Sequence, residues 1–232
     1  MDLLQQFQTA EFWIGLVKII WINIILSGDN AVVIALAARS LPPAQQRKAI
    51  FWGTAAAVIL RIALTVVAAK LLELPYLQIV GGLLLLWIGV QLLGDDDGGE
   101  GEQKHHGSLM SAIRTILIAD LIMSLDNVIG VAAAANGNTT LLIIGLAIAI
   151  PIVIFGSTLM IKLMERFPVI ITVGAGLIGW VAGEAIVSDK VLRGWFPEHS
   201  FQFYLAAAVG AALVIAVGKF IQRRNRAQIS VA

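Results

Sequence analysis

The feature that most constrains this chain is a series of apolar stretches, each about 20 residues long, that recur between residues 12 and 221. An α-helix rises about 1.5 Å per residue, so a stretch of about 20 residues can cross the hydrocarbon core of a bilayer. Of the 232 residues, 59% are hydrophobic and 13% are charged, whereas a soluble domain carries about a quarter of its residues as charged ones. The sequence therefore predicts an all-α polytopic integral membrane protein.

Seven transmembrane helices are predicted, with breaks at turn signals such as S-L-P-P (40–43) and N-G-N (136–138). The predicted spans are 12–37, 50–70, 75–93, 111–135, 140–161, 169–187 and 202–221. The face with the C-terminus then collects eleven Lys and Arg residues and the other face four. Since basic residues favour the cytoplasmic side, we expect a bacterial inner-membrane protein with its N-terminus outside and its C-terminus in the cytoplasm.

The chain contains two related halves. The segment 23–38 resembles 120–135, and both carry S-x-D-N; V-G-G-L-L-L-L-W (80–87) resembles V-G-A-G-L-I-G-W (173–180). Three spans per half is an odd number, so the second half would enter the membrane from the opposite side, as in many secondary transporters. A duplication that only builds a stable bundle is the alternative.

This repeat divides the chain into four parts. We expect a first three-helix repeat at 1–94 and an inverted second repeat at 111–188. Between them, 95–110 forms a cytoplasmic loop with acidic residues and His105 and His106, which is either a solvated linker or a place that gathers metal. An outer loop, a seventh helix without a partner and a basic cytoplasmic tail follow at 189–232.

Carboxylates inside predicted spans are the main functional signal. Asp29 lies in the first span, and Asp120 and Asp126 lie in the fourth. An aspartate at the centre of a bilayer costs about 2.5–3.5 kcal/mol on insertion scales, and it is tolerated where it faces a wet cavity, pairs with a charge or binds an ion. The alternative is a structural role, in which the acids hydrogen-bond the neighbouring serines and asparagines between helices.

The helical spacing groups oxygen ligands on shared faces. Asp120, Ser124 and Asn127 are spaced i, i+4 and i+7. Asn23, Ser27 and Asn30 repeat this spacing in the first half. Hard divalent cations prefer such oxygen ligands, and the thioether of Met123, if it takes part, would favour Mn²⁺ over Ca²⁺ or Mg²⁺.

The depth of these residues leaves two arrangements open. Straight helices would place the carboxylates in a ladder along a path. A kink or an unwound segment, for which Gly28 offers a place, would bring them into a single cage.

Two further charges lie within or near predicted spans. Arg61 is in the middle of the second span, has Val153 at the corresponding position of the other half, and is expected to pair with one of the aspartates. Three carboxylates, one guanidinium and one divalent cation sum to zero charge, which fits a site that is neutral when loaded and takes up protons when empty. Glu184 is a candidate exit ligand or proton relay, or merely an interfacial residue.

The pair S-G-D-N (27–30) and D-L-I-M-S-L-D-N (120–127) resembles the TerC family of bacterial integral membrane proteins, part of a superfamily related to the lysine exporters. The resemblance covers nearly the whole chain and implies a metal-ion exporter for Mn²⁺, not an enzyme, with no prosthetic group. It implies an ion path at Asp29, Asn30, Asp120, Asp126 and Asn127. Many members carry a glutamate where this chain has Asn23, so ligand number and proton stoichiometry stay open.

Other function classes fit the residues less well. An amino-acid exporter of the lysine-exporter type needs one acid for an amine, whereas this chain has three. An intramembrane aspartyl protease would resemble a Y-D plus G-x-G-D pattern, which is absent. A structural or chaperone-like membrane partner is a further alternative. The charges sit in short connectors, which argues against nucleic acid, and the glycines of 174–183 allow close packing within one subunit or in a homo-oligomer.

Overall fold

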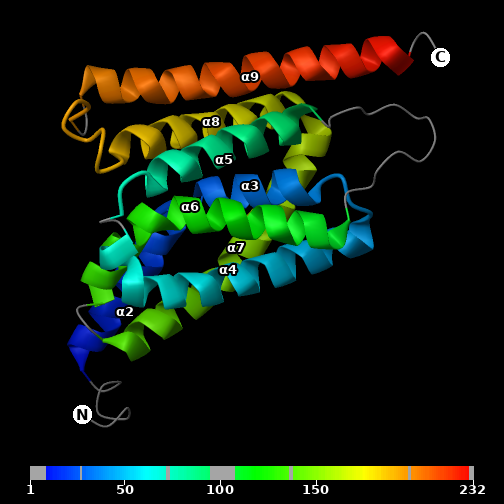
Figure 1. Cartoon of the computed structure of the whole chain (residues 1–232). Helices are drawn as coiled ribbons and strands as arrows, with labels where there is room; N and C mark the ends of the chain where they lie inside the picture. The colour runs from blue at the N-terminus through cyan, green and yellow to red at the C-terminus, as the bar shows by residue number, and fades with distance from the viewer. Residues whose placement is uncertain are drawn as a thin grey trace.

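The computed structural model describes residues 9–26, 28–71, 74–94, 108–135, 138–197 and 200–229, and every regular element among them is an α-helix (Figure 1). The helices are α2 (Ala10–Leu26), α3 (Gly28–Ala38), α4 (Pro43–Leu71), α5 (Leu77–Gly94), α6 (Leu109–Ala135), α7 (Thr139–Arg166), α8 (Val169–Ser188) and α9 (Phe201–Ile229). Among the described residues, five helices are long and apolar enough to cross a membrane, namely α4, α5, α7, α8 and α9. The prediction of an all-α fold is confirmed for the described residues, and these five helices are consistent with the predicted polytopic membrane protein.

The two remaining regions with span-like sequence differ from these five helices. The predicted span 12–37 is described as two helices, since α2 ends at Leu26 and α3 begins at Gly28, within the S-G-D-N motif. Helix α6 has 27 residues, which at about 1.5 Å per residue is long enough to span a bilayer. It also carries Arg114, Asp120 and Asp126, the highest concentration of charge within one of the predicted spans.

The outer surface of the bundle is apolar. Large side chains such as Ile59, Phe155 and Phe201 are exposed on α4, α7 and α9. Apolar patches of this extent on a protein surface mark contact with lipid or with another protein. Lipid is the solvent that this surface fits.

The helices form two groups. Helices α5, α8 and α9 pack together as one layer, and α2, α3, α4, α6 and α7 form a second group beside it (Figure 1). The groups meet mainly where α3 lies against α8 and where α5 lies against α6. We call them the glycine layer, for the contacts described next, and the motif bundle, because it carries both S-x-D-N segments.

Glycines bring α8 and α9 into backbone contact. A Cβ atom added to Gly179 would lie 2.5 Å from the carbonyl oxygen of Gly210, and one added to Gly183 would lie 2.7 Å from Cα of Ala207. Side chains larger than hydrogen therefore do not fit at this seam without separating the helices. The close-packing glycines of 174–183 serve a contact within the chain.

Asp189 joins the ends of α8 and α5. It is 1% exposed, and its Oδ1 accepts hydrogen bonds from the backbone N–H groups of Tyr76 (3.1 Å) and Val191 (2.9 Å). Its Oδ2 accepts from the N–H groups of Gln78 (3.1 Å) and Ile79 (3.4 Å), which are in the first turn of α5. A carboxylate at this position satisfies N–H groups that have no partner within the helix and complements the helix dipole.

The charge state of Asp189 follows from these contacts. Burial by itself raises the pKa of this carboxyl, but the four N–H donors outweigh it and lower the pKa below its usual value. Tyr76, one of the donors, has φ of 66°, a left-handed conformation that is uncommon for residues other than glycine. The carboxylate thus helps to hold a strained turn between α4 and α5.

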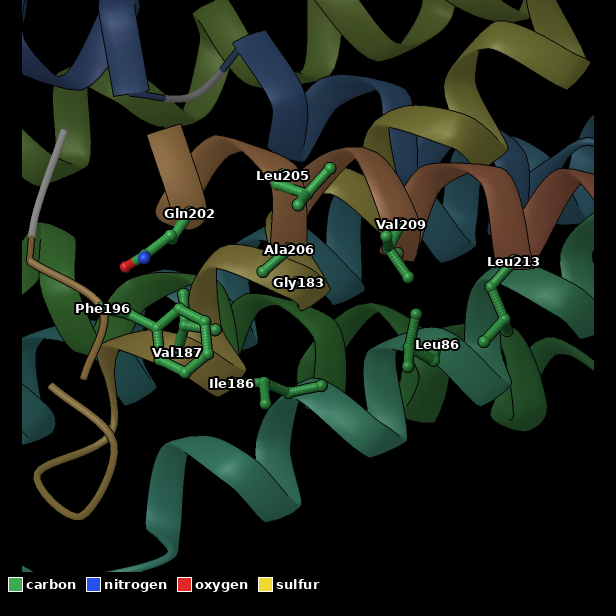
Figure 2. A pocket seen from close by; sticks show the side chains of 11 residues that line it. Leu86, Gly183, Ile186, Val187, Phe196, Gln202, Leu205, Ala206, Val209 and Leu213 are labelled. Atoms are coloured by element: carbon green, nitrogen blue, oxygen red, sulfur yellow. The ribbon is translucent and has the colours of Figure 1, made fainter. Parts of the chain in front are cut away.

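An apolar groove of about 370 Å³ lies between α5, α8 and α9 (Figure 2). It is lined by side chains that include Leu86, Ile186, Phe196 and Val209, with Gln202 as its polar residue. Such a lining offers no charge for a cation. The groove is part of the glycine layer and is separate from the polar residues of the motif bundle.

Candidate functional site

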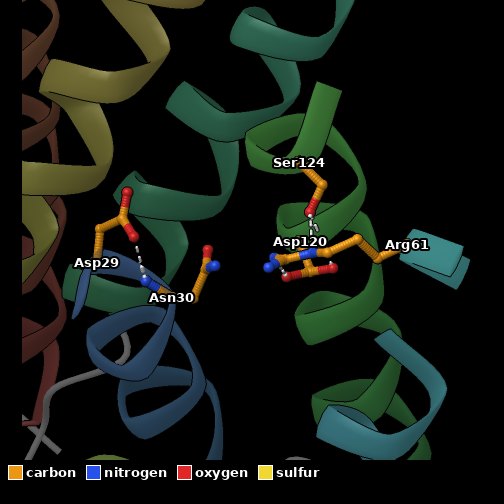
Figure 3. Close-up of polar contacts among 5 residues, drawn as sticks. All are labelled: Asp29, Asn30, Arg61, Asp120 and Ser124. Atoms are coloured by element: carbon orange, nitrogen blue, oxygen red, sulfur yellow. Dashed lines mark hydrogen bonds and ion pairs between the residues drawn. The ribbon is translucent and has the colours of Figure 1, made fainter. Parts of the chain in front are cut away.

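The polar centre of the motif bundle is an ion pair between α4 and α6 (Figure 3). Nη2 of Arg61 donates to Oδ1 of Asp120 at 2.6 Å, and Nε of Arg61 donates to Oγ of Ser124 at 3.0 Å. The hydroxyl of Ser124 donates in turn to Oδ2 of Asp120 at 3.2 Å. The three residues form a closed network in which both oxygens of the carboxylate accept a hydrogen bond.

This network is buried. The exposed fractions are 5% for Arg61, 7% for Asp120 and 0% for Ser124. A buried charge is tolerated when a counter-charge and hydrogen bonds replace water, and the network supplies both. Of the three acids to which the sequence could assign Arg61, the structure selects Asp120.

Local sequence explains why α4 and α6 approach closely enough for this pair. A Cβ added to Gly53 of α4 would lie 2.8 Å from Cδ1 of Ile116 of α6, so the glycine makes room for that side chain. Ile116 precedes Asp120 by four residues and lies on the same face of α6. Arg61, two turns beyond Gly53, therefore faces Asp120 and Ser124.

The first motif lies at the start of α3. Oδ1 of Asp29 accepts a hydrogen bond from the backbone N–H of Asn30 at 2.7 Å, so the carboxylate occupies the N-terminal turn of the helix. Asp29 is half-buried and Asn30 is buried. In Figure 3, Asn30 lies between Asp29 and the Arg61–Asp120 pair, and α3 packs directly on α6.

The remaining predicted site residues differ in their burial and in whether the structure describes their side chains. Asn127 is half-buried on α6. Met123 is buried in the apolar core beside residues such as Ile116, which is the packing role usual for methionine. Ser27 lies outside the described residues, as do the side chains of Asn23 and Asp126 and the loop 95–106.

Glu184 belongs to the other group of helices. Its Oε1 accepts a hydrogen bond from Nε1 of Trp180, one turn earlier on α8, at 2.7 Å. The ring of Trp180 lies against that of Tyr204 of α9, with the centroids 6.4 Å apart. Glu184 is therefore set in the glycine layer, and the structure does not bring it together with Asp29 and Asp120.

The described acids do not form a complete cage. Among the residues that the structure describes, no group of three or more His, Cys, Asp and Glu side chains could hold a metal ion. Asp29 and Asp120 are two of the three predicted carboxylates, and the third, Asp126, has no described side chain. Both the ladder and the cage remain compatible with this arrangement.

Two buried hydroxyls were not singled out from the sequence. Thr54 of α4 and Ser157 of α7 are buried, and neither hydroxyl has a hydrogen-bond partner in the part of the chain that the structure describes. Thr54 precedes Arg61 by seven residues, so both lie on one face of α4. That spacing is the signal that could have identified it, whereas Ser157 has no comparable signal.

These features define a class of protein: an all-α integral membrane protein that buries a carboxylate–guanidinium pair between two helices and carries a second acid at a helix start. A family model for the integral membrane protein TerC family matches residues 8–226. The chain belongs to the TerC family.

The chain is also similar to proteins that are named as membrane proteins. The chain is 44% identical to the uncharacterized membrane protein YjbE of Bacillus subtilis over 92% of this chain and 97% of that protein. It is 26% identical to the UPF0053 inner membrane protein YoaE of Escherichia coli K12 over 93% of this chain and 44% of that protein, so it spans under half of YoaE. No solved structure matches the chain.

Proposed function

We propose that the protein is a membrane transporter that exports divalent metal cations, with Mn²⁺ as its main cargo, by alternating access. The observation that carries the proposal is the buried Asp120, which lies in the second S-x-D-N half beside the start of α3, where the first half places Asp29 and Asn30. Acids inside a membrane bundle mark ion paths. Carboxylate and amide oxygens are the ligands that Mn²⁺ accepts.

The proposed topology has seven spans, with α2 and α3 together as the first. The first two spans of each half then lie in the motif bundle, and the third span of each half, α5 or α8, lies in the glycine layer with α9. This division supports an inverted repeat, in which the N-terminus is outside and the C-terminus is in the cytoplasm. The residue blocks are 1–94 and 111–188, followed by the part that contains α9.

The proposed coupling is exchange of metal for protons. Asp29, Asp120 and Asp126 supply three negative charges, Arg61 one positive charge and the metal two, so the loaded site is neutral. Departure of the metal leaves carboxylates that can accept protons from the opposite side. Asp120 keeps its counter-charge in the meantime, which makes Asp29 and Asp126 the proposed proton acceptors.

The test is flux into proteoliposomes that contain the purified protein. We expect flux of Mn²⁺ above that of Ca²⁺, Mg²⁺, Fe²⁺ and lysine, and opposite proton movement reported by an internal pH dye. Asp29→Asn should abolish Mn²⁺ flux, whereas Glu165→Gln, a change at an exposed acid of α7, should leave it intact. Flux of lysine in place of metal would assign the protein to the amino-acid exporters, and metal flux with a flat pH trace would refute the exchange.

A further inference from the structure

We propose that Arg61 is a tethered cation that competes with the transported metal for Asp120 and thereby determines how readily the metal is released. This inference rests on the proposed export function and deepens it. It makes Arg61 a specificity-determining residue rather than a fixed structural strut. Ser124 becomes a positioning residue, because it acts through the other two.

The first step concerns the oxygens of Asp120. Oδ1 accepts from Nη2 of Arg61 at 2.6 Å, and Oδ2 accepts from Ser124 at 3.2 Å. A divalent metal binds a carboxylate oxygen at about 2.0–2.6 Å. A metal and a guanidinium on the same oxygen would stand within a few ångströms of each other and repel strongly in a buried site. The metal can therefore use Asp120 only if Nη2 moves away.

The second step concerns where the guanidinium goes. Nε of Arg61 donates to Oγ of Ser124 at 3.0 Å, and this bond does not involve Asp120. The guanidinium can give up Oδ1 while Nε stays anchored on the serine. It is then held within reach of the carboxylate and returns when the metal leaves. A buried arginine remains charged at every physiological pH, so this competitor is always present.

The third step concerns the difference between the halves. The position in α7 that corresponds to Arg61 is Val153, a buried apolar residue. Asp29 of the first half accepts from a backbone N–H, and among the described residues the charge of Arg61 acts on it only through space, without an ion-pair contact. Arg61 therefore contests the carboxylate of Asp120 by direct contact and that of Asp29 only at a distance. Such an unequal pair favours capture at Asp29 and release at Asp120.

The experiment measures Mn²⁺ binding to the purified protein together with Mn²⁺ flux in proteoliposomes. Arg61→Gln removes the charge and keeps a hydrogen-bond donor. We expect Kd and KM for Mn²⁺ to fall by about tenfold and turnover to fall by a similar factor, because release becomes slow. Arg61→Lys keeps the competing cation but loses the separate anchor of Nε on Ser124, so its Kd for Mn²⁺ should stay much closer to that of the wild type than the Kd of Arg61→Gln does. If Arg61 had only a structural role, the Arg61→Gln substitution would instead weaken Mn²⁺ binding or leave it unchanged.

Asp120→Asn separates competition at one oxygen from general repulsion. In this background Arg61→Gln should no longer tighten Mn²⁺ binding, since the contested carboxylate is gone. Tightening that persists in the double variant would overturn the proposal. So would an Arg61→Gln protein that binds Mn²⁺ with the wild-type Kd or more weakly.

A titratable substitute covers the case in which Arg61→Gln fails to fold. Arg61→His places a cation there at low pH and a neutral ring at high pH, within the range of about pH 5 to 8. Its Mn²⁺ affinity should rise with pH more steeply than that of the wild type, which has no titratable group at this position in that range. Parallel profiles would overturn the inference. Absence of Mn²⁺ flux by the wild type would instead refute the proposed function, so the two failures are distinguishable.

Discussion

Glycines allow close approach both where α8 meets α9 and where α4 meets α6, but different atoms make the two contacts. At the first seam, Gly179 and Gly210 place backbone against backbone. At the second, Gly53 admits the flexible side chain of Ile116, and an ion pair between Arg61 and Asp120 follows further along. Where Gly179 and Gly210 meet, the first contact is made by backbone atoms, whereas the second is made by side chains that can change partner.

This difference distinguishes the glycine layer, whose helices are held together by backbone contacts, from the motif bundle, whose side-chain contacts can be exchanged. The glycine layer is further fixed at one end by Asp189, whose carboxylate spans the start of α5 and the end of α8. The motif bundle instead contains a carboxylate with a movable cation on it. Alternating access requires one group of helices to shift against another, and we expect the shift to occur between these two groups.

The largest expected effect is at the backbone seam. Gly210→Leu would force a side chain against the carbonyl of Gly179, with no flexible atom to yield, and overpacking against backbone exceeds the cost of about 1–3 kcal/mol usual for a crowded core. We expect loss of monodisperse protein in size-exclusion chromatography. Gly194→Ala, at a glycine with open space around its Cβ position, is the matched control and should purify normally. A well-folded Gly210→Leu protein would contradict the rigid seam.

The next effect concerns movement between the groups. The chain has no cysteine, so an introduced pair is the only source of a disulfide. A Cβ built on Gly81 of α5 lies 3.7 Å from Cβ of Ile122 of α6, within the range of about 3.5–4.5 Å found in disulfides. We expect oxidation of Gly81→Cys/Ile122→Cys to reduce Mn²⁺ flux to background and a reductant to restore it.

A second cysteine pair controls for oxidation itself. A Cβ built on Gly94 of α5 lies 3.5 Å from Cβ of Ile221 of α9, so Gly94→Cys/Ile221→Cys forms its disulfide inside the glycine layer. This protein should transport equally well oxidised and reduced. Undiminished flux through the oxidised cross-layer protein would show that the two groups do not move against each other.

A smaller effect is expected at the clamp between α5 and α8. Asp189→Asn replaces one acceptor oxygen by an NH₂ group, so backbone N–H groups lose their partner at a cost of about 1–3 kcal/mol. The folded protein lowers the pKa of Asp189, so the wild-type advantage is present above the unfolded pKa of about 3.9 and disappears as pH falls through the folded pKa. Tm values in detergent should differ most near pH 7 and converge below about pH 4. An equal difference at pH 7 and pH 3 would contradict the role of the charge.

The sequence predicted the all-α fold, because apolar length is a local property. It also identified the acids inside predicted spans, and their role in a site stays a prediction. It could not choose a partner for Arg61, since that choice depends on α4 and α6 lying side by side, with Asp120 and Arg61 distant in sequence. Asp189 escaped notice for the same reason. In the sequence it is an ordinary acid in a connector, and only the approach of residues 76–79 gives it three of its four donors. Met123, three residues before Asp126, was a possible ligand from its spacing; the structure packs it in the apolar core, and its role toward a metal stays a prediction.

The smallest expected effect is at Gly28, the glycine of the first motif. A Cβ added there has nothing within 4 Å, in contrast to Gly179 and Gly210, and its φ is not in the left-handed region. Gly28→Ala should therefore leave Tm unchanged or raise it slightly, because alanine is favoured over glycine in a helix by up to about 1 kcal/mol. Thermal unfolding followed by tryptophan fluorescence measures this, with Gly53→Ala, which meets Ile116, as the comparison that should lower Tm. A marked loss of stability in Gly28→Ala would mean that the start of α3 is as tightly packed as the seam between α8 and α9, and the contrast between the two groups of helices would not hold.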